Sequence, residues 1–255
     1  MTRILNNKYL YLLFIILFIL SILNKSINTD LSKIKKCNQL DFEQASLLHP
    51  NNFAPFQIYI SFTNDKKWHS NQLKNRKTYL KNNYYLNKNR NKAEIIISIP
   101  KKIKCSLSVS IKPHGDLEDH HIPFNLLPSL QVKIKDGHIF GITNFLLLKP
   151  KTRLSIDSEI FATAIIKELD LLAPRTTRAI INYNDTRQNY IFQEKIVKEF
   201  LEINNFKEGE IISFDDRFNY TEDFDIINNS QYKLVNNKWG KENNILSFRN
   251  NIEVL

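Results

Sequence analysis

Strict alternation of apolar and polar side chains in the middle of the chain constrains its fold most. Residues 105–111 (CSLSVSI) alternate without interruption, and in residues 130–135 (LQVKIK) three apolar side chains alternate with three polar ones. Successive side chains of a β-strand point to opposite faces of the sheet, so both segments are predicted to be half-buried strands. The dipeptide Asp136-Gly137 follows the second strand and is typical of a tight hairpin turn. Residues 139–148 are therefore expected to return as an antiparallel partner strand.

Four further segments are predicted to be strands, two before this hairpin and two after it. They are residues 56–62, 95–99, 176–183 and 189–193. Between the end of this hairpin and the strand that begins at residue 176, residues 158–173 have the apolar period of a helix. Pro174 is expected to end that helix, because proline donates no backbone hydrogen bond and disfavours helical geometry in the residue before it. The sequence therefore predicts an α+β fold, a mostly antiparallel sheet with one main packed helix.

A short apolar run near the start of the chain predicts export. Arg3 and Lys8 precede residues 9–23, which are apolar except for Ser21. A membrane span needs roughly 20 apolar residues, and the apolar core of a signal peptide about 7–15. No small-residue cleavage site follows, so we expect an uncleaved signal anchor that crosses the membrane once through residues 4–23. A cleaved signal peptide is the alternative. In both cases the charge asymmetry predicts that the bulk of the chain is extracytoplasmic, either periplasmic or at the cell surface.

The predicted organisation has four parts. They are an N-terminal membrane helix or signal peptide (residues 1–25), a polar juxtamembrane linker (26–52), a β-rich domain (53–205) and a weakly patterned C-terminal segment (206–255). The chain has two cysteines, Cys37 in the linker and Cys105 in the β-rich domain. Two cysteines of an exported chain can form a disulfide, and two unpaired thiols are the alternative.

Residues 65–92 combine basic and aromatic side chains. The segment contains nine lysines and arginines against the single acid Asp65, and the whole chain has a formal net charge of +10. A basic surface attracts anionic partners. For an exported chain we expect a surface protein or an anionic envelope polymer as the partner, and no nucleic acid. A solvated helix followed by a loop, with no binding role, is the alternative.

Glu168 is the one residue of the predicted helix that departs from its pattern. At about 100° per residue it falls about 20° from Phe161, near the centre of the apolar face that includes Ile165. A buried unpaired carboxylate is costly, so it must find a cation or a hydrogen-bond donor, or become protonated. The candidate cations are Lys133 and Lys135, which share one face of the preceding strand. A purely structural ion pair is the alternative to a binding role.

Several segments together resemble the spore coat protein H (CotH) kinase-like family, in its exported bacterial branch. They are SLQVKIKDG, LLLKPKTR, EIFATAIIKELDLLAPRT, YIFQEKIVKEFLE and EGEIISFDDRF, and the resemblance covers about residues 105–220. It implies the N-terminal lobe of an atypical kinase, which transfers phosphate from ATP, with Mg²⁺, to serines of surface proteins. It also implies that Lys133 or Lys135 binds phosphate and that Glu168 is the helix partner of that lysine. Gln193 and Glu194 would then lie beside the adenine.

The chain departs from this family after residue 205. Fifty residues follow, fewer than a helical catalytic lobe contains, and they include no recognisable catalytic loop or metal motif. We therefore assign no catalytic residue and no metal ligand, and leave open whether the chain is an enzyme. The resemblance implies a nucleotide-binding remnant or one part of a protein kinase. A non-catalytic module that binds the cell envelope and an inactive truncated fragment are the alternatives.

Overall fold

The structure is a computed structural model that describes nine stretches of the chain: residues 34–37, 56–82, 89–99, 103–115, 118–121, 127–139, 141–153, 156–214 and 232–236. The chain divides into two units, Met1–Lys35 and Lys36–Leu255, and the fold belongs to the second. The predicted anchor (residues 1–25) and most of the linker and of the C-terminal segment lie outside the described residues. Within the described stretches, no helix is long and apolar enough to cross a membrane.

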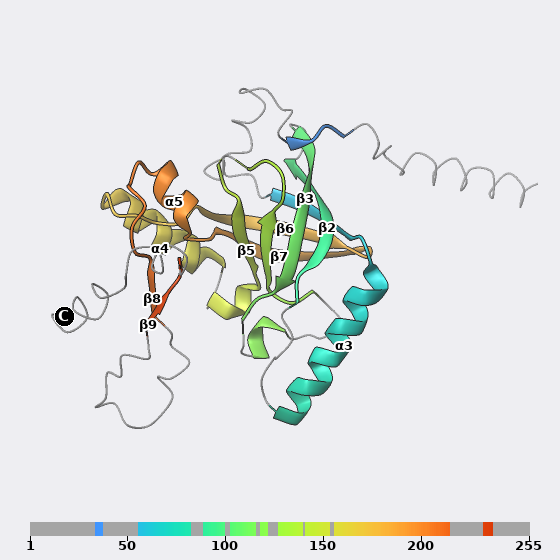
Figure 1. The fold of residues 1–255 in the computed structure, drawn as a ribbon. Helices are drawn as coiled ribbons and strands as arrows, with labels where there is room; N and C mark the ends of the chain where they lie inside the picture. Colours follow the sequence, from blue (N-terminus) through green and yellow to red (C-terminus); the bar gives the residue numbers. More distant parts are fainter. Residues whose placement is uncertain are drawn as a thin grey trace, which may run out of the picture. The chain divides into compact units, whose positions relative to one another are not determined.

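Seven strands close into a barrel in the order β1-β2-β3-β4-β5-β7-β6 (Figure 1). They are β1 (Phe56–Phe62), β2 (Asn91–Ile99), β3 (Ile103–Pro113), β4 (Leu130–Ile134), β5 (Asn144–Leu148), β6 (Thr176–Tyr183) and β7 (Thr186–Glu194). All neighbours are antiparallel except β1 and β6, whose parallel pairing closes the barrel. The predicted α+β class and mostly antiparallel sheet are confirmed. Closure was not predicted, and it leaves the seven strands without an edge.

Alternate side chains of these strands fill the barrel. On β3, Leu107, Val109 and Ile111 point into the core, whereas Ser108 between them is exposed. Tyr190 on β7 is fully buried, and its hydroxyl donates a hydrogen bond to the carbonyl of Leu127. The interior is thus a packed core, as is usual in barrels of this size.

In the described stretches, three helices and a two-stranded sheet lie outside the barrel. The helices are α3 (Asp65–Asn82), α4 (Ile156–Glu168) and α5 (Lys198–Ile203), with short 3₁₀ turns η3 (Glu118–His120) and η4 (Pro150–Arg153). Strands β8 (Ile212–Phe214) and β9 (Tyr232–Leu234) pair antiparallel. Helix α3 is inserted between β1 and β2 and leaves the barrel beside the end of β1, whereas α4 connects β5 to β6 (Figure 1).

Both predicted hairpins form, with differences in their turns. Between β4 and β5, Gly137 and Gly141 have φ of 85° and 79°, and Ile139 and Ile142 exchange two backbone hydrogen bonds. Because the chain makes an additional turn between Ile139 and Ile142, the partner strand begins at Asn144 and not at residue 139. The β6–β7 turn is shorter than predicted, because Asn184 and Asp185 both have positive φ, which is typical of a two-residue type I′ turn.

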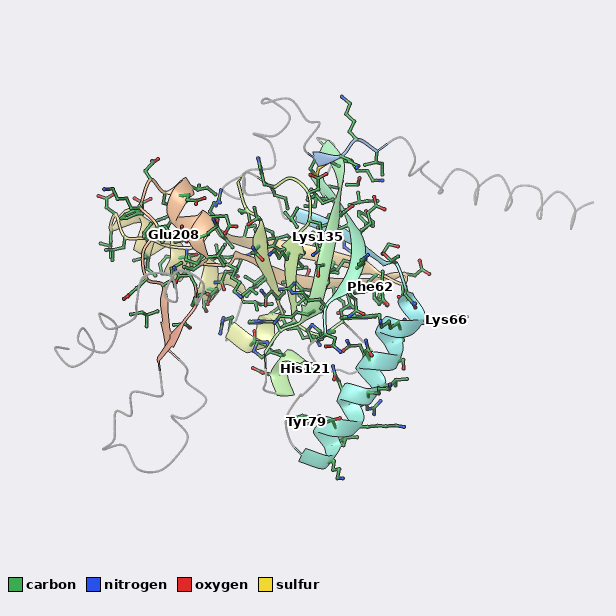
Figure 2. The ribbon with its side chains drawn as sticks, in the orientation of Figure 1. Phe62, Lys66, Tyr79, His121, Lys135 and Glu208 are labelled. Atoms are coloured by element: carbon green, nitrogen blue, oxygen red, sulfur yellow. A yellow bond between two sulfur atoms is a disulfide. The ribbon has the colours of Figure 1, made fainter. Side chains whose placement is uncertain are left out.

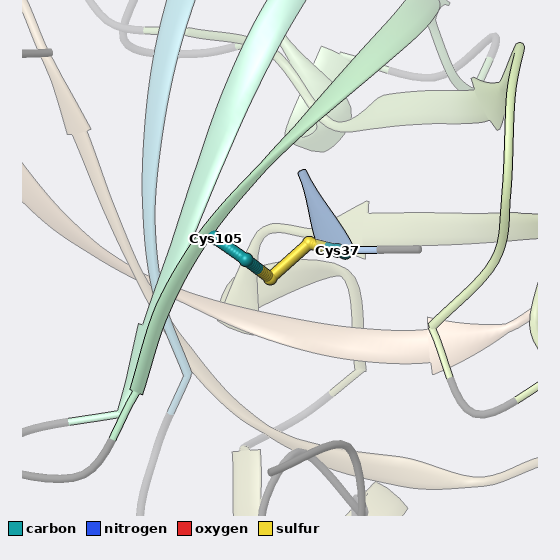
Figure 3. Close-up of a disulfide and its surroundings, with 2 residues drawn as sticks. All are labelled: Cys37 and Cys105. Atoms are coloured by element: carbon teal, nitrogen blue, oxygen red, sulfur yellow. A yellow bond between two sulfur atoms is a disulfide. The ribbon is translucent and has the colours of Figure 1, made fainter. Parts of the chain in front are cut away.

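A disulfide joins Cys37 to Cys105, across 68 positions of sequence (Figure 3). Lys36 also forms an isolated parallel bridge with Ser106. The sequence left the pairing of the two cysteines open, and the structure shows that they pair. The bond attaches residue 37 covalently to β3.

The orientation of α4 differs from the prediction. Phe161 is 68% exposed and Glu168 is exposed as well, whereas Thr163 on the other side of the helix is buried. On the buried side, Gln193 of β7 donates a hydrogen bond to Glu159. In the first turn, the exposed Asp157 contacts Arg178 of β6. The prediction that Glu168 is buried is therefore wrong. The outer face of β6 and β7 presents polar side chains at this position. The more polar side of α4 therefore packs against the sheet, and its apolar side faces outward.

The end of α4 also differs from the prediction. The helix ends at Glu168, before Pro174, and Asp170 adopts φ of 56°. The N–H of Leu171 donates to the carbonyl of Ile166, and the N–H of Asp170 donates to that of Lys167. These two bonds form a Schellman motif, which closes the helix four residues before the proline.

Candidate functional site

The lysines and the glutamate predicted to form an ion pair lie apart. Lys133 is exposed on β4 and pairs across the ladder with Asn144, and Lys135 is exposed just after that strand (labelled in Figure 2). Among the described residues, neither lysine forms an ion pair with Glu168. The reason is topological, because α4 packs on β6, and β5 and β7 separate β6 from β4. The predicted pair is therefore not formed.

Gln193 and Glu194, at the end of β7, are buried and already bonded. Gln193 contacts Glu159 of α4. Both carboxylate oxygens of Glu194 accept hydrogen bonds from the guanidinium of Arg175, at 2.7 Å from Nε and 2.6 Å from Nη2. Arg175 was missed in the sequence, although its position directly after Pro174 and opposite the strand end was a usable signal. The role of Glu194 that the structure shows is to fix the chain between α4 and β6 to β7.

A cavity of about 560 Å³ lies between α4 and the start of β6. It is lined by three cations (Lys167, Arg175 and Arg178), two acids (Asp157 and Glu168) and mostly small or polar neighbours. Its volume falls in the range of small-molecule sites. Two of the cations already bind carboxylates, since Arg175 is paired with Glu194 and Arg178 with Asp157. An anion entering this cavity would compete with those two pairs.

The outward side of α3 carries a continuous set of cations. They are Lys66, Lys67, Lys74, Arg76, Lys77 and Lys81, and all six are exposed. The only acid of the helix, Asp65, is engaged at the barrel end, where it accepts a hydrogen bond from the hydroxyl of Tyr183 at 2.7 Å and contacts His69. Burial, and after it this hydrogen bond to Asp65, raises the pKa of Tyr183, which keeps its hydroxyl a donor. No acid of α3 therefore neutralises the cationic side.

Two leucines lie within this cationic side. Leu73 is 60% exposed and Leu80 is 67% exposed. At about 100° per residue they fall within about 20° of each other, inside the arc of about 180° that runs from Arg76 to Lys67 and nearer to its Arg76 end. The charge of this segment was predicted from the sequence, whereas the two leucines were not, although a helical projection of residues 65–82 places them together.

The opposite side of α3 fixes the helix to the barrel. The Asn64 side chain caps the first turn by accepting a hydrogen bond from the N–H of Lys67 at 2.9 Å. The ring of Trp68 is 1% exposed and stacks on Phe62 of β1 with 4.1 Å between centroids. Tyr183 packs edge-on against the same Phe62. Aromatic stacking and the cap hold the first turns of α3 in one orientation relative to the barrel (Phe62 and Lys66 are labelled in Figure 2).

No protein-family model matches this chain, and comparison with curated proteins finds none that is similar to it. Two places in the described part of the chain have chemistry that could support a function, the cationic side of α3 and the cavity beside α4.

Proposed function

We propose that this chain is a membrane-anchored, extracytoplasmic binding module that docks on an anionic component of the cell envelope through the outward side of α3. The observation that carries the proposal is the set of six exposed cations with no acid among them, on a helix whose first turns are fixed to the barrel by Trp68. The disulfide between Cys37 and Cys105 supports an oxidising location, because disulfides persist outside the reducing cytosol.

The dimensions of this surface suit an extended anionic partner. From Lys66 to Lys81 the helix rises about 22 Å, at about 1.5 Å per residue. Cations spread over that length can contact several phosphates or carboxylates at once, and each contact is weakened by salt. The proposed binding is therefore multivalent and sensitive to ionic strength.

The test is a titration of the full chain, held in nanodiscs of neutral lipid, with polyphosphate as a soluble polyanion. In one variant Lys74, Lys77 and Lys81 of α3 are changed to Gln. Its matched control changes Lys133, Lys135 and Lys207, which are also exposed, to Gln. Because a cation near an anionic surface contributes about 1 kcal/mol, we expect the α3 variant to bind at least about tenfold more weakly and the control to bind almost normally. Equal weakening of both variants would show a dependence on net charge alone and would contradict the proposal.

A second candidate function is nucleotide binding, either as a remnant or as one part of a CotH-like protein kinase. The observation that favours it is the cavity beside α4, where Glu168 lies with Arg175, the partner of Glu194. In this reading ATP would occupy the cavity with its phosphates near Lys167. The described stretches contain no group of three or more side chains that could hold a metal ion, so they offer Mg²⁺ no ready-made site.

Thermal unfolding with and without ATP and Mg²⁺ tests this candidate. Stabilisation by ATP that disappears in Lys167→Ala and persists in Lys133→Ala would support binding in the cavity. The opposite pattern would restore the role of Lys133 implied by the CotH resemblance. An unfolding temperature that ATP does not change would exclude both.

A further inference from the structure

We infer that the anionic component is the lipid headgroup layer of the membrane that holds the chain's own N-terminal segment, and that Leu73 and Leu80 enter its interface. This inference rests on the proposed function, because it requires α3 to be the docking surface. It adds the identity of the partner and a specific role for the two leucines.

The two leucines distinguish a bilayer from a soluble polymer. Both side chains are more than half exposed, at 60% and 67%, and both lie among lysines that flank them on the same side of α3. A hydrated polyanion would cover the cations and leave these apolar groups in water. A helix lying at a bilayer surface satisfies both kinds of side chain, since leucines enter the acyl boundary while lysines contact headgroup phosphates.

The covalent structure keeps the barrel within reach of that surface. Residues 24–36 separate the apolar run, which ends at Leu23, from Cys37, and the disulfide fixes Cys37 to Cys105 on β3. A chain extends at most about 3.6 Å per residue, so the point of attachment on β3 stays within about 50 Å of the end of the apolar run. Such a tether gives a high effective concentration, and a surface too weak to bind from free solution can then dock.

Charge and apolar contact are both required by this geometry. The leucines alone are too few to hold a helix at an interface, whereas the lysines alone would accept any polyanion. The combination predicts docking on a leaflet that contains anionic lipid and little docking on a neutral one. A docked α3 would hold the barrel close to the membrane and leave the cavity beside α4 to other partners.

The test places a benzophenone amino acid at Leu80 of the full chain and measures light-induced crosslinks to lipid. The chain is reconstituted in nanodiscs of phosphatidylcholine with or without phosphatidylglycerol. Phe206, which is also exposed but lies after α5, carries the same group in a control chain. We expect lipid adducts at Leu80 to increase about fivefold with phosphatidylglycerol, and those at Phe206 to stay the same.

A second pair of variants separates failure of the inference from failure of the proposed function. Leu73→Ser, measured with the Leu80 probe, should reduce lipid adducts without weakening polyphosphate binding. If Leu80 gives no more lipid adducts than Phe206, while polyphosphate binding still depends on the α3 lysines, the partner is a polymer. The inference is then overturned and the proposed function stands. If polyphosphate binding is also independent of those lysines, both are overturned. Near-ultraviolet circular dichroism of each variant confirms that its barrel is folded.

Discussion

Arg175 and Glu194 form a two-point ion pair at the junction of α4, β6 and β7. Their side chains are 9% and 3% exposed, and the backbone N–H of Glu194 also donates to the carbonyl of Arg175 at 2.9 Å. The pair therefore joins the chain that leaves α4 to the end of β7 by both side chain and backbone. Removing either partner would leave a buried charge without compensation.

The Glu194→Ala variant should lose about 3–5 kcal/mol of unfolding free energy, as is typical when one partner of a buried ion pair is removed. Urea denaturation measures the loss. Arg175→Ala and the double variant, which carries both substitutions, complete a double-mutant cycle. We expect the double variant to lose less than the sum of the single losses. Arg178→Ala is the control, because its pair with Asp157 is exposed and should cost less than about 1 kcal/mol. Similar losses in Glu194→Ala and Arg178→Ala would contradict the importance of the buried pair.

Asp170→Gly should stabilise the protein. Asp170 closes the Schellman motif of α4 with φ of 56°, a backbone region that glycine adopts without the strain of a side chain. The expected gain in unfolding free energy is about 0.5–1 kcal/mol, measured by thermal or urea denaturation. Ala162→Gly, within the same helix and exposed, should instead cost up to about 1 kcal/mol. A loss of stability in Asp170→Gly would show that the aspartate makes a contribution that the backbone geometry does not explain.

Removal of the disulfide should destabilise the barrel. The bond closes a loop of 68 positions, for which the loss of unfolded-state entropy predicts about 4 kcal/mol of stabilisation. A chain with both Cys37 and Cys105 changed to Ala tests this by denaturation without a reductant. The unchanged chain should lose a similar amount of unfolding free energy when its disulfide is reduced. If reduction destabilises the Ala chain as much as the unchanged chain, the effect comes from the reductant and not from the bond.

Lys149 should make stability rise with pH in mildly alkaline solution. Burial, with a smaller contribution from the charge of Lys151, lowers the pKa of Lys149 from 10.5 to about 8. Between these values the unfolded chain binds the proton and the folded chain does not, so the unfolding free energy increases with pH. After solvent screening we expect a rise on the order of 1 kcal/mol. Denaturation curves should be compared between pH 8 and about 9.5, because Tyr183 and Tyr190 have raised pKa values and destabilise the folded chain above pH 10.

Lys149→Met is the matched variant for this measurement. It removes the buried amine and keeps the length of the side chain, so it should abolish the rise between pH 8 and 9.5. A rise that is the same in both chains would assign the pH dependence to other groups.

The positions of the strands along the chain could be predicted from the sequence, because most of them have a local apolar pattern. Residues 56–62 and 176–183 were assigned with the bounds that the structure shows. Closure depends on the parallel pairing of β1 with β6, a contact between segments more than a hundred residues apart that no local pattern specifies. The position of Glu168 was wrong for a related reason. Helical periodicity identifies two faces of α4, but the polar surface of β6 and β7 decides which of them is buried.

The candidate surface on α3 could be predicted only in part. The basic composition of residues 65–92 is visible in the sequence. A solvated helix in this segment was also among the predictions. The distinction between its two sides depends on Trp68, whose burial against Phe62 sets which side of the helix faces outward. That contact joins a helix to a strand, and composition alone does not reveal it.

The most direct test of the account is the reactivity of the α3 lysines on the full chain. The measurement is the rate at which an amine-reactive ester acetylates Lys74, Lys77 and Lys81, read by mass spectrometry, in neutral nanodiscs alone, with polyphosphate and with phosphatidylglycerol in the lipid. Lys135 and Lys207, exposed elsewhere on the same unit, are the internal references. The account predicts that an anionic ligand slows acetylation about fivefold or more at the three α3 lysines and leaves the reference lysines almost unchanged. If neither ligand slows acetylation of the α3 lysines more than that of the reference lysines, the account is contradicted.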